Sequence, residues 1–390
     1  MGEQRKIVTA APENSETPLD ATRGWVTPNP LFFVRNHFEP PPIDGERWRL
    51  RVEGCVDHVI EWTWQELLDL PQRTVFATVE CAGNGRSFLE PRMPGVAWGA
   101  GAIGHAEWTG VPVRSLLERA GLQPHAIEVL FEGADQGTEP DHPEPMHFAR
   151  SLPLAKSLHP DTLLATRMNG ELLEAIHGAP LRLFVPGWYG VASVKWLNRI
   201  EVLDRSFCGY FQTKKYTYQR RTEKGLETTI VGPMAVKSEI IRPRKDEVIG
   251  IGTNRIVGLA WAGEHAIANV RVSTDGGQTW AAANLIGPQA PYSWNMWEYL
   301  WEQSRPGTYA LMAQATSTAG QVQPKEYDPL YAGYMIHFSR PLTVQVRADT
   351  RSQATAGNIH ALLFDINAYA EENRRAPLDL DAQYCEGSGI

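Results

Sequence analysis

Hydrophobic and polar positions divide the chain into two regions with different patterns. In the first region, "RWRLRVEG" from Arg47 alternates in the way of a half-buried strand, and "AIEVLFEGAD" is an apolar strand that ends in a turn. "TWQELLDL" begins with a cap at Thr63 and "VPVRSLLERAGL" ends at Gly121, so both stretches predict short helices. "PLRLFVPG" and "VKWLNRIEVL" predict two further strands. This mixture predicts an α+β domain over residues 26–228.

From Met234 the pattern changes to short alternating strands separated by turns. "IVGLAWAG", "WNMWEYLWE" and "GTYALMAQATSTAG" each predict a strand, and "STDGGQTW" carries the Asp-Gly signal of a hairpin. Strands that recur with little helix predict a β-sandwich over residues 234–348. The charged stretch "QRRTEKGLETT" that precedes this region is predicted to be irregular.

The two ends of the chain differ from both regions. The first residues are polar and contain proline, which predicts a mobile N-terminal arm over residues 1–25. Order is expected to begin near "LFFVRNHFEPPPID", an extended segment that ends in a rigid proline turn. Residues 349–390 form a C-terminal extension in which "HALLFDINAYAEENRR" resembles a helix, and no role is assigned to it.

Charge, cysteine spacing and hydrophobicity limit which partners the protein is expected to bind and in which compartment it is expected to lie. The net charge of −8 is spread along the chain, so neither nucleic acid nor an anionic membrane is an expected partner. The four cysteines form no CxxC, CxxCH or zinc-type spacing, which argues against a disulfide framework and favours a reducing compartment. No apolar run has the length of a signal peptide core or a membrane span. We therefore expect a cytoplasmic protein, with the periplasm as the alternative if a leader has been removed.

Cys81 stands where the β-branched run of "VFATVECAGNGRSFLEP" breaks into small residues. A strand is expected to deliver this thiol to a glycine-rich turn beside Arg86, and a nearby cation and turn amides lower the pKa of a thiol. A thiolate serves as a nucleophile or as a soft metal ligand. The alternative is a small buried hydrophobic residue, and the local sequence leaves the two readings about even.

Cationic side chains recur in segments that are otherwise apolar. Arg35 and His37 lie two apart in an extended segment, so both can face one anion, although a surface charge beside a packed histidine is the ordinary alternative. "HGAPLRLFVPGWYGVASVKWL" adds four polar residues, His177, Arg182, Ser193 and Lys195. Together these residues predict a buried cofactor that bears a phosphate.

The motifs resemble, in the same order, those of the sulfite oxidase family of molybdenum enzymes. "FVRNH", "CAGNGRS", "HGAPLRLFVPGWYG" and "VKWLNRI" carry the resemblance, and "GLAWAG" with "VRVSTDGGQTW" resembles the C-terminal dimerisation domain of that family. The resemblance covers about residues 30–345. It implies a molybdenum cofactor domain of mixed sheets and short helices, followed by an immunoglobulin-like β-sandwich through which two chains form a homodimer.

The resemblance also implies a role for individual residues. Cys81 would be the metal ligand of a molybdenum held by one molybdopterin. Arg86 and Arg35 would face the substrate, Trp98 would line the anion pocket, and Tyr216 would be the active-site tyrosine. The residues implied in cofactor binding are Arg35, Asn36, His37, Asp135, His177, Arg182, Ser193, Val194 and Lys195.

Two departures from the animal and plant members bear on function. Those members often carry two arginines after "CAGN", whereas this chain has Gly85 and then Arg86, a form similar to bacterial members. No haem-binding domain or CxxCH is visible, so we expect no haem and an external electron acceptor, either cytochrome c or oxygen. The implied activity is oxidation of sulfite to sulfate by oxo transfer. The alternatives are an S-oxide or other oxyanion reductase with the same cofactor, and a non-catalytic cofactor-binding or interaction protein.

Overall fold

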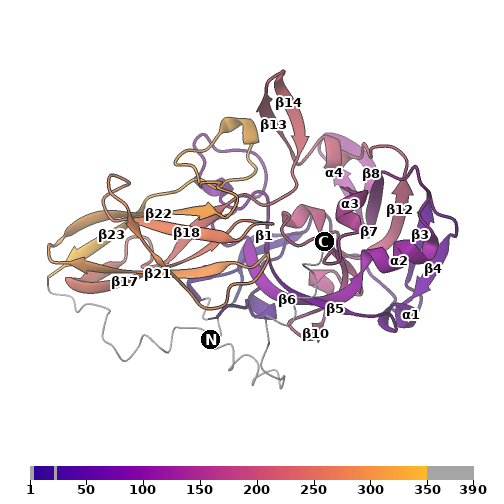
Figure 1. Ribbon diagram of the computed structural model, residues 1–390, viewed down its shortest axis with the longest axis horizontal. Coiled ribbons are helices and arrows are strands. Elements are labelled where there is room, and N and C mark those ends of the chain that lie inside the picture. The colour runs from indigo at the N-terminus through magenta and orange to yellow at the C-terminus, as the bar shows by residue number, and fades with distance from the viewer. Residues whose placement is uncertain (1–3, 22–23, 349–390) are drawn as a thin grey trace. The chain divides into compact units, whose positions relative to one another are not determined.

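The computed structural model describes residues 4–21 and 24–348, which form two compact units (Figure 1). Unit 1 comprises Pro28–Ala235, the residues up to Pro18 and the short segment Tyr327–Ile336. Unit 2 comprises Val236–Glu326, residues 337–348 and the described residues of the segment Leu19–Thr27. The helix predicted within residues 349–390 lies outside the described residues.

The first sheet of unit 1 carries the strand that leads to Cys81. Its order is β10-β9-β6-β5, with β11 paired to β9, and all of its pairs are antiparallel. β5 and β6 pair along the whole of β5, up to Glu80 opposite Ile103, and the last six residues of β5 are buried. Burial of the stretch Val75–Glu80 explains why its apolar residues do not alternate with exposed polar ones, and Thr78 and Glu80 are buried with them. The strands are β5 (Arg73–Glu80), β6 (Ile103–Pro112), β9 (Leu163–Met168), β10 (Glu171–Leu172) and β11 (Arg182–Phe184).

The second sheet of unit 1 has the order β4-β3-β12-β7-β8. Its central strand β12 runs parallel to β3 and antiparallel to β7. Figure 1 shows β12, β7 and β8 side by side in this sheet. The sheet matters for the site because β7 carries Asp135 and β12 begins two residues after Lys195. The strands are β3 (Arg49–Gly54), β4 (Ile60–Thr63), β7 (Glu128–Glu139), β8 (His142–Pro153) and β12 (Leu197–Leu203).

The two predicted helices of unit 1 are confirmed. The expected residues mark their boundaries, Thr63 at the start of the first helix and Gly121 at the end of the second. Thr63 caps α1 (Trp64–Leu68) in a capping box with Glu66, which satisfies backbone N–H groups at the helix start. α2 (Val113–Ala120) ends at Gly121, whose φ of +75° is strained for residues with a side chain. The other α-helices among residues 4–21 and 24–348 are single turns, α3 (Leu154–Ser157) and α4 (Tyr210–Thr213).

The prediction of a mobile arm over residues 1–25 was wrong for the described part of that range. β1 (Lys6–Ala10) and β2 (Glu13–Glu16) form an antiparallel hairpin, and Ser15 bridges to Val34 of the extended segment. Asn14, Ser15 and Glu16 of β2 are buried although they are polar. Asn14 donates to Thr9 of β1 and accepts from Arg35, so the polar composition of the range concealed its order.

The prediction that "QRRTEKGLETT" is irregular was also wrong. β13 (Thr217–Thr222) and β14 (Gly225–Ile230) form a hairpin that closes at Gly225, where φ is +115°. Most of its side chains are exposed or half-buried, so the strands show no alternation of apolar and polar residues. Turn geometry and cross-strand polar pairs define this hairpin instead.

Unit 2 is the predicted β-sandwich. One sheet has the order β15-β17-β21-β20 and the other β16-β23-β22-β18-β19. A single apolar core contains Ile256 and Trp297 from the first sheet and Val270 and Leu311 from the second. The predicted Asp-Gly hairpin joins β18 to β19, and Asp275 accepts hydrogen bonds from the backbone of its turn. The strands are β15 (Lys237–Arg242), β16 (Val248–Gly250), β17 (Gly252–Trp261), β18 (Ile267–Ser273), β19 (Ala281–Ala282), β20 (Asn284–Ile286), β21 (Asn295–Gln303), β22 (Gly307–Ser317) and β23 (Leu342–Arg347).

The segment Tyr327–Ile336 corrects the predicted domain boundary. It lies between β22 and β23 in the sequence and was assigned with them to residues 234–348, but it packs as part of unit 1. Met335 donates its backbone N–H to the carbonyl of Ala82 at 2.8 Å, directly beside Cys81. The pattern of hydrophobic residues does not show that this segment leaves unit 2 and packs in unit 1, because the segment forms no strand with a regular pattern.

Candidate active site

Cys81 lies at the point where β5 ends and a tight turn begins. Its backbone N–H bonds to Ala102 O at 2.9 Å, and Asn84 N–H bonds back to Cys81 O at 2.9 Å. Gly85 has a φ of +97°, and a side chain there would also meet Ile336 at 3.1 Å. The turn therefore presents the thiol to a cavity whose lining includes Arg35, Lys195 and Tyr216.

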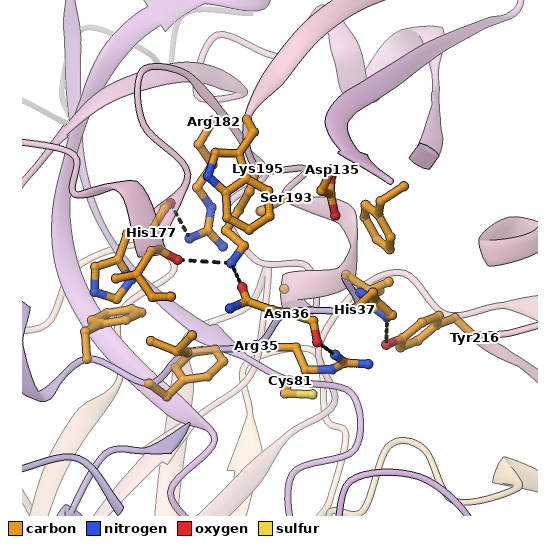
Figure 2. A pocket seen from close by; sticks show the side chains of 18 residues that line it. Arg35, Asn36, His37, Cys81, Asp135, His177, Arg182, Ser193, Lys195 and Tyr216 are labelled. Carbon is orange, nitrogen blue, oxygen red and sulfur yellow. Dashed lines mark hydrogen bonds between the residues drawn. The ribbon is translucent and has the colours of Figure 1, made fainter. Parts of the chain in front are cut away.

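The extended segment Phe33–His37 forms a second wall of this cavity. Asn14 of the N-terminal hairpin holds it, since Asn14 Oδ1 accepts from Asn36 N at 3.0 Å and from Arg35 Nη1 at 3.3 Å. Arg35 also donates to the backbone oxygen of Asn36. Figure 2 shows Arg35 and Cys81 close together, with Asn36 reaching toward Lys195.

The third wall comes from the segment His177–Lys195. Lys195 Nζ donates to Asn36 Oδ1, and to Ile176 O at 3.0 Å. Arg182 donates to the backbone oxygen of His177 at 3.3 Å. Gly178 allows this packing because its φ is +108° and a side chain there would meet Lys195 at 2.9 Å. Asp135 of β7 and Tyr216, which precedes β13, complete the lining. Figure 2 labels ten lining residues: Arg35, Asn36, His37, Cys81, Asp135, His177, Arg182, Ser193, Lys195 and Tyr216.

Four buried polar atoms of the cavity lining have no hydrogen-bond partner in the protein. They are Asn36 Nδ2, Asp135 Oδ1, His177 Nε2 and Arg182 Nε. Buried polar atoms are nearly always paired, and each unpaired one costs about 1–3 kcal/mol. The three nitrogen atoms can donate hydrogen bonds, and the oxygen of Asp135 can accept one. They therefore fit a large polar ligand that both accepts and donates hydrogen bonds.

The electrostatics of the cavity favour an anionic ligand. Burial lowers the pKa of Arg182 to about 10, and burial together with the charge of Arg182 holds the pKa of Lys195 well below its ordinary value. Burial raises the pKa of Asp135 to about 7, against the opposing charge of Lys195. Cations therefore outnumber carboxylates around the cavity, and a phosphate would stabilise their charged forms. A thiol at the other end of the same cavity adds a soft metal ligand.

His37 and Tyr216 form a hydrogen-bonded pair in the lining of the same cavity. His37 Nε2 lies 2.6 Å from Tyr216 Oη, and the His37 ring stacks on Phe148. Burial, aided by the charges of Arg35 and Lys195, holds the pKa of His37 well below its ordinary value. Burial raises the pKa of Tyr216 to about 12. A neutral imidazole and a protonated phenol therefore share this bond, and Tyr216 is kept in the left-handed backbone region at φ +55°.

Three residues of the predicted site do not line this cavity. Arg86 is buried and donates to Gly333 O and Val96 O, both at 3.0 Å, while its guanidinium lies 5.5 Å from the Tyr334 ring centre. Trp98 is fully buried, and its backbone oxygen accepts from Ser87 N. Val194 is a buried residue whose backbone oxygen accepts from Leu183 N. These predicted residues support the walls rather than forming the cavity surface.

Sequence reasoning missed two residues next to the site. Tyr334 lies with its ring 5.0 Å from that of Tyr216 and accepts the Tyr216 backbone N–H at 3.3 Å. The only indication in the sequence was the group of tyrosines in "YDPLYAGY", a stretch that lies within the predicted β-sandwich. Arg150 is fully buried and donates to Val231 O at 3.0 Å and to Phe211 O. An arginine inside the apolar part of β8 was its only signal.

Within the described ranges, no helix has the length and apolar character needed to cross a membrane.

Comparisons with known proteins assign the chain to a class. The family "Oxidoreductase molybdopterin binding domain" matches residues 37–211, and the family "Mo-co oxidoreductase dimerisation domain" matches residues 228–336. The first match contains most of the cavity lining, and the second covers most of the described strands of unit 2. The fold and these matches together place the chain in the class of molybdopterin-binding oxidoreductase domains.

Individual relatives narrow this class. Sulfite oxidase of Gallus gallus is 32% identical over 353 residues, which cover 84% of this chain and 74% of that protein. Mitochondrial sulfite oxidase of Drosophila melanogaster is 33% identical over 351 residues, and the chain spans 60% of its length. The crystal structure of the sulfane dehydrogenase SoxCD from Paracoccus pantotrophus matches with a TM-score of 0.77 and 29% identity over 89% of each chain. The chain belongs to the sulfite oxidase family of molybdopterin oxidoreductases.

Proposed function

We propose that this protein oxidises sulfite to sulfate with a molybdenum–molybdopterin cofactor and passes the electrons to an external acceptor. One observation carries the proposal: the Cys81 thiol opens onto the same cavity as the unpaired buried donors and the excess of cations. A metal ligand and a phosphate-binding set around one cavity fit a metal bound through an organic phosphate. Similarity to the sulfite oxidases supports sulfite as the substrate.

The cofactor-binding roles follow from the chemistry of each wall. Cys81 Sγ would hold the molybdenum as a thiolate. Arg182, Lys195 and His177 would hold the phosphate, since all three lie on one wall and carry cationic or donor atoms. Asp135 Oδ1 would accept an N–H of the pterin ring, and Asn36 Nδ2 would donate to the ligand. When bound, the cofactor supplies two-electron redox chemistry and oxo transfer.

The substrate would lie beside Tyr216 and Arg35, on the side of the thiol away from Lys195. The Tyr216 phenol stays protonated at neutral pH, so it can donate a hydrogen bond to an anionic oxygen while His37 fixes its direction. Arg35 supplies a positive charge at the same end of the cavity. Arg86, bonded to two carbonyls, would contribute its charge from behind the wall and hold Tyr334 against Tyr216.

The test is a steady-state assay on protein whose molybdenum content has been measured. We expect sulfite to drive reduction of at least one of ferricyanide, cytochrome c and oxygen, with one sulfate formed for each pair of electrons. Fully loaded protein that remains silent with every acceptor would overturn the substrate. Cys81→Ser is expected to lose activity by at least a thousandfold, whereas Cys208→Ser, at an exposed cysteine, is expected to keep it. Retention of activity by Cys81→Ser would overturn the metal-ligand role.

A second candidate keeps the cofactor and changes the substrate to an S-oxide or another oxyanion that is reduced. The environment of Arg86 favours it, since two carbonyls already occupy the guanidinium and Gly85 supplies no second charge. A weaker positive field suits a neutral S-oxide better than a dianion. Reoxidation of the reduced cofactor by dimethyl sulfoxide or nitrate, without sulfite turnover, would favour this candidate. Loaded protein that is inactive in every assay would favour a non-catalytic binding protein.

The assembly and compartment complete the proposal. The match of residues 228–336 to a dimerisation domain supports a homodimer. Light scattering after gel filtration is expected to give twice the chain mass, and a monomer at micromolar concentration would contradict it. We propose a cytoplasmic location without a haem on this chain, and both points are open to direct measurement by fractionation and by the visible absorption spectrum.

A further inference from the structure

Three loops at one end of the neighbouring strands β3, β12 and β7 bring together three side chains of types that can bind a metal ion. Cys55 follows β3, Asp204 follows β12, and His125 lies between α2 and β7. The Cys55 sulfur, a His125 ring nitrogen and an Asp204 carboxylate oxygen all lie within 4.8 Å of one another. None of the three lines the cavity that holds Cys81, so this cluster has no place in the proposed reaction.

Backbone hydrogen bonds fix the loops that carry these side chains. Cys55 N bonds to Val202 O at 2.8 Å, and Gln123 N bonds to Cys55 O at 3.1 Å. Ile127 N bonds to Leu203 O at 2.8 Å, which ties the His125 loop to the strand that precedes Asp204. The three residues therefore meet because the sheet and its connections place them there, not because flexible side chains happen to touch.

The three side chains are available to a ligand. The hydrogen bonds and ion pairs of the described residues do not use the Cys55 sulfur or the His125 ring. Asp204 makes only an exposed ion pair with Arg205 at 3.4 Å. Cys55 is half-buried, while His125 and Asp204 are exposed, so a metal ion can enter from solvent and meet the sulfur last.

The donor set selects the metal. A thiolate excludes magnesium and calcium, which take oxygen ligands, whereas sulfur, imidazole and carboxylate together suit zinc. Zinc bonds of about 2.0–2.3 Å place tetrahedral donors roughly 3.3–3.8 Å apart, so small rotations of the exposed side chains bring these three to that spacing. We propose that Cys55, His125 and Asp204 bind one zinc ion, with water as the fourth ligand, and that the ion ties the three loops together.

The test uses the full chain after treatment with a chelator, with zinc alone as the probe and a chromophoric zinc chelator as competitor. We expect one zinc per chain at this site with micromolar or tighter affinity, and a rise in the unfolding temperature when zinc is added. Cys55→Ser and His125→Ala are each expected to weaken binding at least tenfold. Cys208→Ser and His58→Ala, at an exposed cysteine and an exposed histidine, are the matched controls and are expected to bind normally.

Thiol labelling gives a second readout that does not depend on how well a variant folds. Zinc is expected to protect one thiol of the native protein, and the same thiol is expected to be missing in Cys55→Ser. Asp204→Asn, which changes only an exposed side chain, is expected to weaken zinc binding without lowering stability. No zinc binding, or binding that these three substitutions leave unchanged, would overturn the proposal. Sulfite oxidation plays no part in any of these measurements.

Discussion

Two buried lysines, one in each unit, have different surroundings. Lys237 of unit 2 lies 3.6 Å from Glu239 Oε1, and the other oxygen of Glu239 lies 2.7 Å from Arg340. Lys195 of unit 1 donates to an amide and a carbonyl oxygen, and no ion pair within 4 Å joins it to a carboxylate of the described residues. Asp135 is the carboxylate whose charge acts on Lys195, and burial raises the pKa of Asp135 to about 7. Both amines also face a tryptophan ring, at 4.2 Å for Lys195 and 5.6 Å for Lys237.

The difference separates a structural charge from a ligand-binding one. A buried ion is tolerated when its counter-ion lies beside it, as for Lys237 and Glu239. A buried cation without a counter-ion lowers stability unless a ligand supplies the negative charge. Lys195 therefore marks a site that a bound anion completes, while Lys237 belongs to a pair that the chain completes by itself.

The largest expected effects come from replacing each lysine with methionine. Lys195→Met is expected to reduce molybdenum and pterin content more than tenfold, because the phosphate loses a buried cation, while the unloaded protein is expected to be at least as stable as before, because the desolvation cost of that cation is removed. Lys237→Met is expected to keep the cofactor content but to lower the free energy of unfolding by about 3 kcal/mol, because a buried ion pair loses one partner. Metal analysis and urea unfolding of the unloaded proteins measure both effects. A loss of cofactor in Lys237→Met, or normal loading of Lys195→Met, would remove the distinction.

Arg86 is an intermediate case, since carbonyl oxygens rather than a carboxylate surround its buried charge. Arg86→Lys keeps the charge but cannot reach both Gly333 O and Val96 O in the same geometry. We expect kcat/KM for sulfite to fall about tenfold to a hundredfold at normal molybdenum content, because Tyr334 moves relative to Tyr216. Tyr334→Phe keeps the ring and loses only the hydroxyl, so a fall of less than fivefold is expected. Wild-type kinetics in Arg86→Lys would show that this support has no role.

A pH dependence sharpens the comparison further. Burial first, then the charges of Lys195 and Arg182, lowers the pKa of His177 to about 3 in the folded state. Between pH 6.5 and about 3 the unfolded chain therefore binds one more proton at this residue, and the free energy of unfolding falls by about 1.4 kcal/mol for each pH unit of acidification. His177→Gln is expected to remove this part of the slope in cofactor-free protein. His58→Gln, at an exposed histidine, is the control, and an unchanged slope in His177→Gln would contradict the cause.

The smallest expected effect concerns a charge pair that is exposed. Arg221 of β13 pairs with Asp328, and their side chains are 69% and 32% exposed. Water and salt screen such a pair, so Arg221→Ala is expected to lower the free energy of unfolding by no more than about 0.5 kcal/mol and to leave activity unchanged. A loss of more than about 2 kcal/mol in urea unfolding would show that the hairpin holds the segment Tyr327–Ile336 in place.

The sequence predicted those features that local residue patterns determine. The caps of α1 and α2, the strand that leads to Cys81 and the Asp-Gly hairpin are all confirmed, since each depends on neighbouring residues. Most of the predicted cofactor-binding residues line one cavity, because three short motifs converge there. Val194 does not line it, because it is a buried residue that joins β11 through the bond from Leu183 N to its backbone oxygen.

Other features depend on contacts between residues that are distant in the sequence. The N-terminal hairpin looks mobile in composition, yet Asn14 holds Arg35 and Asn36. Tyr334 lies 118 residues after Tyr216, within the range 234–348 for which the sequence predicts a β-sandwich. The local sequences "ASVKW" and "AVKSE" are similar around Lys195 and Lys237, so only the structure distinguishes the two lysines.

Cofactor analysis of the purified protein tests the central claim most directly. Protein produced in cells that make molybdopterin is expected to contain one molybdenum and one pterin per chain, detected by metal analysis and by the fluorescence of the acid-oxidised pterin. Folded protein that contains neither would contradict the assignment of the cavity around Cys81 and Lys195, and with it the proposed oxidation of sulfite.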